Sequence, residues 1–88
     1  MQIKRIQWDY DAWKEYCEWQ QINKSILKRI NQLVKDMCRS PFEGIGKPEP
    51  LKDNLSGFWS RRIDGTNRIV YAVDRDAVVI ISCKGPYE

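Results

Sequence analysis

Two segments in the first half of the chain carry apolar residues at helical spacing. The stronger pattern lies within residues 24–39, where the apolar positions form one continuous stripe: Ile26, Leu27, Ile30, Leu33, Val34, Met37 and Cys38. A shorter set lies just upstream: Ala12, Trp13, Tyr16 and Cys17. Asp9 or Asp11 can cap the first segment, and Asn23 can cap the second. The pattern therefore predicts two consecutive helices, the second ending at Ser40-Pro41.

Runs of β-branched and aromatic residues predict strands on both sides of these helices. A short, imperfectly alternating segment, residues 3–8, precedes the helices, and three runs follow them at residues 58–63, 69–73 and 77–83. Asp64-Gly65 is a typical tight turn between two of these runs. We expect an α+β fold in the order β-α-α-β-β-β, with two N-terminal helices packed on a twisted antiparallel sheet.

The segment from Pro41 to Pro50 is predicted as an ordered loop because it is rich in proline and glycine. Within it Lys47 and Glu49 each precede a proline, which restricts their backbone to extended geometry. A carboxylate on such a stiff segment loses little entropy when it meets a substrate, which suits Glu49 to the role of a general base. The alternative is a rigid surface loop on which Glu49 is only solvated.

Length and composition indicate one soluble domain spanning residues 1–88. The chain has 88 residues, of which 42% are hydrophobic and 31% charged, as in ordinary globular proteins. No apolar run approaches the ~20 residues of a membrane span. The first residues are also too polar for a signal peptide. We therefore expect a cytoplasmic protein that does not associate with membranes.

The chain contains no histidine, which excludes Ser-His-Asp and Cys-His nucleophile systems and nearly every common zinc site. Its three cysteines, Cys17, Cys38 and Cys83, are odd in number and widely spaced. Reduced thiols that fill the core are the simplest interpretation, with metal binding as the alternative. We predict no metal and no cofactor.

Basic residues are concentrated in two places, although the net charge is only +3. Residues 24–39 hold five lysines and arginines against the single acid Asp36. A second group, Arg61, Arg62 and Arg68, flanks the predicted hairpin turn. Clustered cations suit a polyanion such as RNA, whereas a solvated helix face is the alternative for residues 24–39.

The three arginines of the hairpin cannot all act together. Strand alternation places Arg61 and Arg62 on opposite faces, so only one of them can share a face with Arg68. A guanidinium group there can bind a phosphate and stabilise developing charge, or it can pair with Asp64 or Asp74.

Aromatic residues outside the predicted core are further candidates for RNA contact. Trp59 or Trp19 can stack on a base, whereas Trp8 and Trp13 fit the core pattern. The hydroxyl of Tyr87 can serve proton transfer, or its ring can stack on a base.

Three strings of sequence carry a family resemblance. GKPEPLK at residues 46–52, GFWSRRI at 57–63 and RIVYAV at 68–73 resemble the YoeB toxins of the RelE/ParE superfamily of bacterial toxin–antitoxin systems. The likeness extends from about Lys4 to Tyr87. It implies a toxin of a type II system that acts as a ribosome-dependent mRNA endonuclease and cuts the A-site codon.

The resemblance also implies a mechanism and its residues. The ribose 2′-OH attacks the adjacent phosphate without a metal, Glu49 matches the family's general base, and Arg68 matches its phosphate-stabilising arginine. Lys52 and Arg62 match supporting cations, and Tyr87 matches the C-terminal tyrosine. The implied partners are a YefM-like cognate antitoxin, the 70S ribosome with A-site mRNA, and a second copy in a homodimer.

One position departs from the family pattern. The family places a histidine, its general acid, directly before the final tyrosine, but this chain has Pro86 there. A proline side chain cannot transfer a proton, so we expect cleavage to be weaker by about 10²–10⁴-fold. Pro86 is either a selected inactivating change or a natural divergence.

Two other functions remain open. The first is a catalytically inactive homologue that binds ribosome or antitoxin. The second is a gyrase inhibitor of the ParE type, which the presence of Glu49 and Arg68 disfavours.

Overall fold

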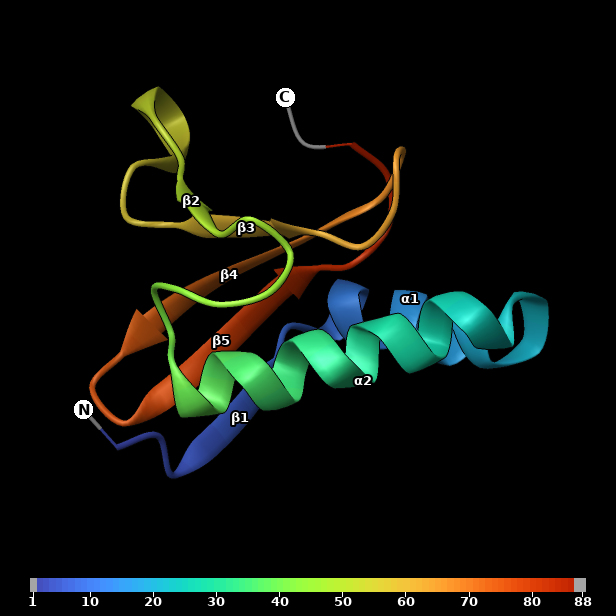
Figure 1. The fold of residues 1–88 in the computed structure, drawn as a ribbon, viewed down its shortest axis with the longest axis horizontal. Coiled ribbons are helices and arrows are strands. Elements are labelled where there is room, and N and C mark those ends of the chain that lie inside the picture. The colour runs from blue at the N-terminus through green and yellow to red at the C-terminus, as the bar shows by residue number, and fades with distance from the viewer. Residues whose placement is uncertain (1, 87–88) are drawn as a thin grey trace.

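A computed structural model of the protein describes residues 2–86, in which two helices pack on a five-stranded sheet (Figure 1). The elements follow one another along the chain as β1 Arg5–Trp8, α1 Tyr10–Ile22, α2 Lys24–Arg39, β2 Glu49–Pro50, a 3-10 turn Asp53–Leu55, β3 Trp59–Arg62, β4 Arg68–Asp74 and β5 Ala77–Ser82. The predicted α+β class is confirmed, and both helices and the four predicted strands appear in the predicted order.

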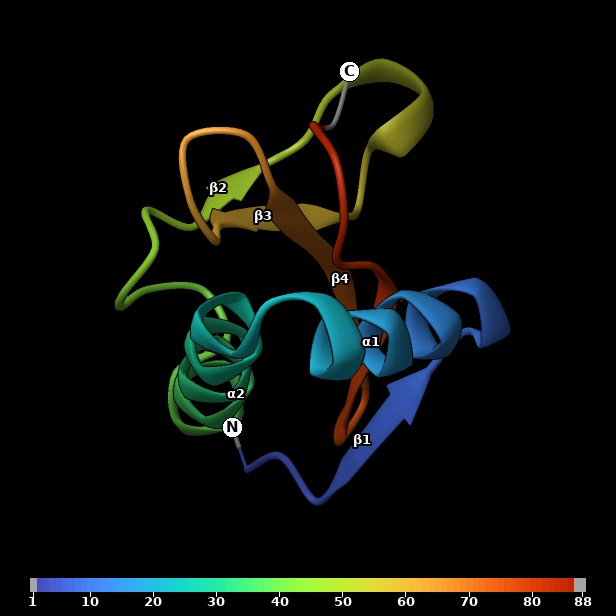
Figure 2. The same ribbon diagram turned by 90° about the vertical axis from the view of Figure 1, so that its right-hand side faces the viewer.

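The sheet differs from the prediction at its two edges. Its strand order is β1-β5-β4-β3-β2, and β1 pairs with β5 in parallel whereas the other pairs are antiparallel. β2 lies in the segment predicted as a loop, where the two pre-proline residues already favour extended backbone. In both views the β2–β3 end of the molecule lies opposite β1 (Figures 1 and 2).

The apolar stripe of α2 forms the centre of the core. Ile30, Leu33 and Met37 are fully buried, and they belong to one cluster with residues of the sheet: Ile69, Tyr71, Val78, Ile80 and Cys83. The predicted cap of α2 is present, because the Asn23 side chain accepts hydrogen bonds from two backbone N–H groups of the first turn.

Cys83 and Trp13 were both predicted as core residues, but only Cys83 is buried. Burial raises the pKa of the Cys83 thiol to about 12, so this sulfur is an unreactive core atom. Trp13, predicted as core, is 45% exposed and stacks on Tyr16 with the ring centroids 5.6 Å apart.

Arg61 is a correction to the sequence prediction, because it was expected to contact RNA and is instead completely buried. Its Nε donates to the Tyr71 hydroxyl at 3.0 Å, and its Nη1 donates to Asp36 Oδ2 at 2.7 Å. The remaining guanidinium bonds go to the backbone carbonyls of Ser40, Glu43 and Ile45. A guanidinium with its N–H groups bonded inside the protein has none to offer a phosphate.

The Arg61 network fixes the loop between α2 and β2. Asp36 also accepts bonds from Arg39 and from the backbone N–H of Ile45. Next along the chain, the Gly46 carbonyl accepts a 2.7 Å bond from the Arg62 N–H. Gly46 has a φ of +81°, and a Cβ there would lie 2.6 Å from the Leu33 side chain, so only glycine fits this crossing. Contacts from Arg61 and Arg62 thus hold the loop from its start at Ser40 to Gly46, shortly before Glu49.

Within residues 2–86, none of the helices has the length and apolar character that crossing a membrane requires.

We expect Arg61→Met to lower the free energy of unfolding by about 3–5 kcal/mol, because it removes the buried partner of the Asp36 carboxylate and the guanidinium donor of three loop carbonyls. Urea unfolding followed by circular dichroism measures the change. The matched control is Arg62→Met on the neighbouring exposed position, which should cost no more than about 0.5 kcal/mol. Equal stability of the Arg61→Met protein and its parent would contradict the assignment.

Asp36 makes stability depend on pH. Desolvation alone would raise its pKa, but hydrogen bonds from Arg39, the Ile45 N–H and Arg61 outweigh it and lower the pKa from 3.8 to about 2. Because the folded pKa is the lower one, the contribution, about 2 kcal/mol, is complete above the unfolded pKa and is lost as the pH falls toward 2. Asp36→Asn should flatten the unfolding free energy over this range, and parallel pH profiles for the two proteins would contradict the account.

Candidate active site

Glu49 and Arg68 meet on the face of the sheet opposite the core. β2 and β4 both pair with β3, so Glu49 lies opposite Ser60 and Arg68 lies opposite Arg62. The Arg68 Nη1 donates to Glu49 Oε1 at 3.0 Å. The Glu49 side chain is 56% exposed and that of Arg68 is 24% exposed, so both remain accessible to a ligand.

Ser60 lies beneath this ion pair and was missed by the sequence analysis. It is fully buried, and its Oγ accepts a 3.1 Å bond from the same Nη1 of Arg68. The signal available in the sequence was its spacing, because Ser60 lies two residues before Arg62 on the same face of β3. Its hydroxyl limits the orientations open to the Arg68 guanidinium.

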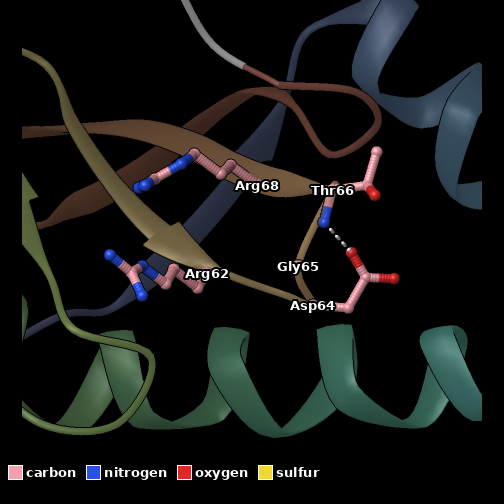
Figure 3. Close-up of a pocket in the computed structure, with 5 residues that line it drawn as sticks. All are labelled: Arg62, Asp64, Gly65, Thr66 and Arg68. Atoms are coloured by element: carbon pink, nitrogen blue, oxygen red, sulfur yellow. Dashed lines mark hydrogen bonds between the residues drawn. The ribbon is translucent and has the colours of Figure 1, made fainter.

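Arg62 is the second arginine on this face, as strand alternation predicted for either Arg61 or Arg62. Together with Arg68 and the turn residues Asp64, Gly65 and Thr66 it lines a surface cavity of about 260 Å³. Figure 3 shows the two guanidinium groups extending toward the same side, whereas the Asp64 carboxylate points back to its own turn. Two guanidinium groups on one side of a cavity suit an anion with several oxygens, such as a phosphate.

The Asp64 carboxylate is hydrogen-bonded within its own turn, and the ion-pair partner of Arg68 is Glu49. Asp64 accepts hydrogen bonds from the backbone N–H groups of Asn67 and Thr66. These bonds, with that of Asn67 contributing most, lower the pKa of Asp64. The predicted alternative, in which Asp64 pairs with an arginine across the hairpin, is therefore wrong.

The remaining RNA-contact candidates lie outside the cavity. Lys52 is exposed just beyond β2. Trp59 is half-buried, and its ring centroid lies 5.0 Å from that of Phe42. Trp19 is only 7% exposed and donates its indole N–H to the Cys83 carbonyl, so the prediction that it can stack on a base is wrong.

The C-terminal tail runs beside Arg68. The Arg68 backbone N–H donates to the Gly85 carbonyl at 3.1 Å, and the Gly85 N–H donates to the Asn67 side chain at 2.8 Å. Pro86 follows and is exposed. The predicted candidate Tyr87 lies outside the described residues.

The arrangement places a base and a cation in contact on an accessible face, with a cavity beside the cation. Glu49 can accept a proton, and Arg68 with Arg62 can balance charge on a phosphate. Among residues 2–86, no group of three or more cysteine and acidic side chains is close enough together to hold a metal ion.

Comparison with known proteins places the chain in one family. Residues 8–87 match the model of a YoeB-like toxin of bacterial type II toxin–antitoxin systems. Toxin YoeB of Escherichia coli K12 is 53% identical over 83 residues, which cover 94% of this chain and 99% of that protein. Toxin YoeB of Synechocystis is 56% identical over 88% of this chain and 90% of its own length.

Experimental structures agree with the sequence comparison. A YoeB/ParE toxin from Agrobacterium tumefaciens superposes with a TM-score of 0.93 at 37% identity, covering 96% of this chain and all of that one. The YoeB–YefM complex from Staphylococcus aureus gives a TM-score of 0.88 at 44% identity over 99% of this chain and 100% of its counterpart. Family membership also brings the general reaction, since YoeB- and RelE-type toxins are endonucleases. The chain belongs to the YoeB family of toxins of bacterial type II toxin–antitoxin systems.

Proposed function

We propose that this protein is a toxin that cuts mRNA in the ribosomal A site and does so slowly because Pro86 cannot act as an acid. The observation that carries the proposal is the contact between Glu49 and Arg68 on an accessible face, with Arg62 alongside. RNA cleavage by its own 2′-OH requires a base and a cation at one phosphate, and this pair supplies both.

The proposed reaction begins at the ribose. Glu49 removes the 2′-OH proton, and the 2′ oxygen then forms a bond to the adjacent phosphorus. Arg68 and Arg62 balance the charge of the five-coordinate phosphorane, with Lys52 as a further cation near the RNA backbone. The bond from phosphorus to the 5′ oxygen then breaks, which leaves a 2′,3′-cyclic phosphate and a 5′ oxygen that must gain a proton.

This chain lacks the family's acid for protonating the departing 5′ oxygen. Pro86 occupies the position at which the family carries its histidine, and its ring has no proton to give. The departing oxygen then takes its proton from water or from Tyr87, and cleavage is slower by about 10²–10⁴-fold.

A second candidate function rests on the same substitution. A homologue that binds the ribosome or an antitoxin without cutting would also tolerate Pro86. The retained Glu49–Arg68 contact favours the enzyme, because binding alone does not require a carboxylate and a guanidinium to converge on one exposed point.

The proposed partners follow from relatives. YoeB of Staphylococcus aureus forms a complex with YefM and also a dimer. We extend both to this chain: a YefM-like antitoxin and a homodimer, with the 70S ribosome as the site of action in the cytoplasm.

Pro86→His should raise cleavage of A-site codons by about 10²–10⁴-fold, because it returns a proton donor to the tail. Primer extension on programmed ribosomes measures the rate. Pro86→Ala, which removes the ring without adding an acid, is the matched control and should give no gain. If the histidine variant binds ribosomes but cuts no faster than its parent, acid loss does not explain the chain's activity.

In the Pro86→His background, Glu49→Gln and Arg68→Gln should each reduce the cleavage rate by at least about 10²-fold while ribosome binding in co-sedimentation changes little. Glu43→Gln is the matched control, since Glu43 is an exposed carboxylate in the segment between α2 and β2, whereas the carboxylate bonded to Arg68 is that of Glu49. Equal rates for the Glu49→Gln and Glu43→Gln variants would remove Glu49 from the mechanism.

A further inference from the structure

The Asn67 side chain connects the β3–β4 turn to the C-terminal tail. Its Nδ2 donates to both carboxylate oxygens of Asp64, at 3.3 and 3.2 Å, while its Oδ1 accepts the Gly85 N–H at 2.8 Å. Asn67 is only 9% exposed, so its amide is largely withdrawn from water.

Asn67 is itself held rigidly. Its backbone carbonyl accepts bonds from the N–H groups of Ile63 and Asp64, and its own N–H donates to the Asp64 carboxylate at 2.6 Å. An amide side chain suits this place, because its N–H groups can donate to the Asp64 carboxylate while its oxygen accepts the Gly85 N–H.

Hydrogen bonds hold the tail at two residues before residue 86. At the first, Cys83 donates its N–H to Glu15 and accepts the indole N–H of Trp19. At the second, both sides of Gly85 are bonded, the N–H to Asn67 and the carbonyl to the Arg68 N–H. Gly85 has a φ of +82°, so the chain bends at this point in a conformation that favours glycine.

We propose that Asn67 is a positioning residue, which holds the tail so that residue 86 enters the active site beside Arg68. The inference rests on the proposed function, because it assigns a purpose to the place of the general acid. Asn67 does not itself line the cavity, but its side chain joins Asp64, which does, to the tail that carries position 86. A displacement of about 1 Å at such a position can slow a reaction by about 10²-fold.

A double-mutant comparison on programmed ribosomes separates positioning from general structural support. Asn67→Ala should reduce cleavage by about 10–100-fold when residue 86 is histidine. In the parent, where Pro86 has no proton to place, the same substitution should change the residual rate by less than about threefold. An equal loss in both backgrounds would show a structural role and overturn the proposal.

The exchanged pair Asp64→Asn with Asn67→Asp is the rescue control. It keeps a carboxylate and an amide in contact and still offers an oxygen to the Gly85 N–H, so it should recover most of the activity that Asn67→Ala loses. If the exchanged pair leaves thermal stability unchanged but does not recover cleavage, the proposed role of Asn67 in holding the tail is contradicted.

Hydrogen exchange of the Gly85 amide tests the bond between Gly85 and the Asn67 side chain without measuring catalysis. Asn67→Ala should speed this exchange at least about tenfold while the core amides of β4 keep their protection. Unchanged Gly85 exchange overturns the proposal. If Pro86→His fails to restore cutting but Asn67→Ala still speeds Gly85 exchange, the acid-loss mechanism is rejected. The bond by which Asn67 holds the tail is then still supported.

Discussion

The position of Glu49 beside Arg68 depends on the hydrogen bonds of the buried Arg61 guanidinium. This guanidinium replaces water for three loop carbonyls, a tyrosine hydroxyl and the Asp36 carboxylate in a space where each unpaired group would be costly. The loop it fixes runs from the end of α2 to β2 and ends at Glu49. A flexible loop in this place would leave the carboxylate free to move away from Arg68, and pre-organisation of the pair would be lost.

β3 separates structural and chemical roles by the alternation of its side chains. Arg61 points into the core, whereas Ser60 and Arg62 belong to the face that carries Glu49 and Arg68. Two adjacent arginines thus have opposite functions, one as the centre of a buried network and one as a cation beside an open cavity. This short strand therefore supports both the stability of the loop and the electrostatics of the site.

The elements with strong local patterns could be predicted from the sequence. The stripe of α2, its Asn23 cap and the hairpin runs are properties of neighbouring residues, and they appear as expected. The parallel pairing of β1 with β5 could not be predicted, because it joins segments about 70 residues apart and no local pattern states strand direction.

The site shows the same limit at the level of side chains. Alternation alone says that Arg61 and Arg62 face opposite ways, but only the position of Asp36 on α2 decides which one is buried. Ser60 and Asn67 look like ordinary strand and turn residues in the sequence, and their importance comes from partners brought together by folding. Glu49 before a proline and Arg68 at the hairpin were candidates from the sequence itself, and the family resemblance gave them the same roles. The contacts that hold the tail at Gly85 are visible only in the structure.

The central claim is that Glu49 and Arg68 act on a phosphodiester through the neighbouring 2′-OH. The most direct measurement uses the Pro86→His protein and mRNA with a single 2′-deoxy nucleotide at the cleavage site in the A-site codon, followed by analysis of the fragment ends. The account predicts that the all-ribose message gives a 2′,3′-cyclic or 3′ phosphate and a 5′-OH, and that the 2′-deoxy message stays intact. Cleavage of the 2′-deoxy message at the same bond would contradict it.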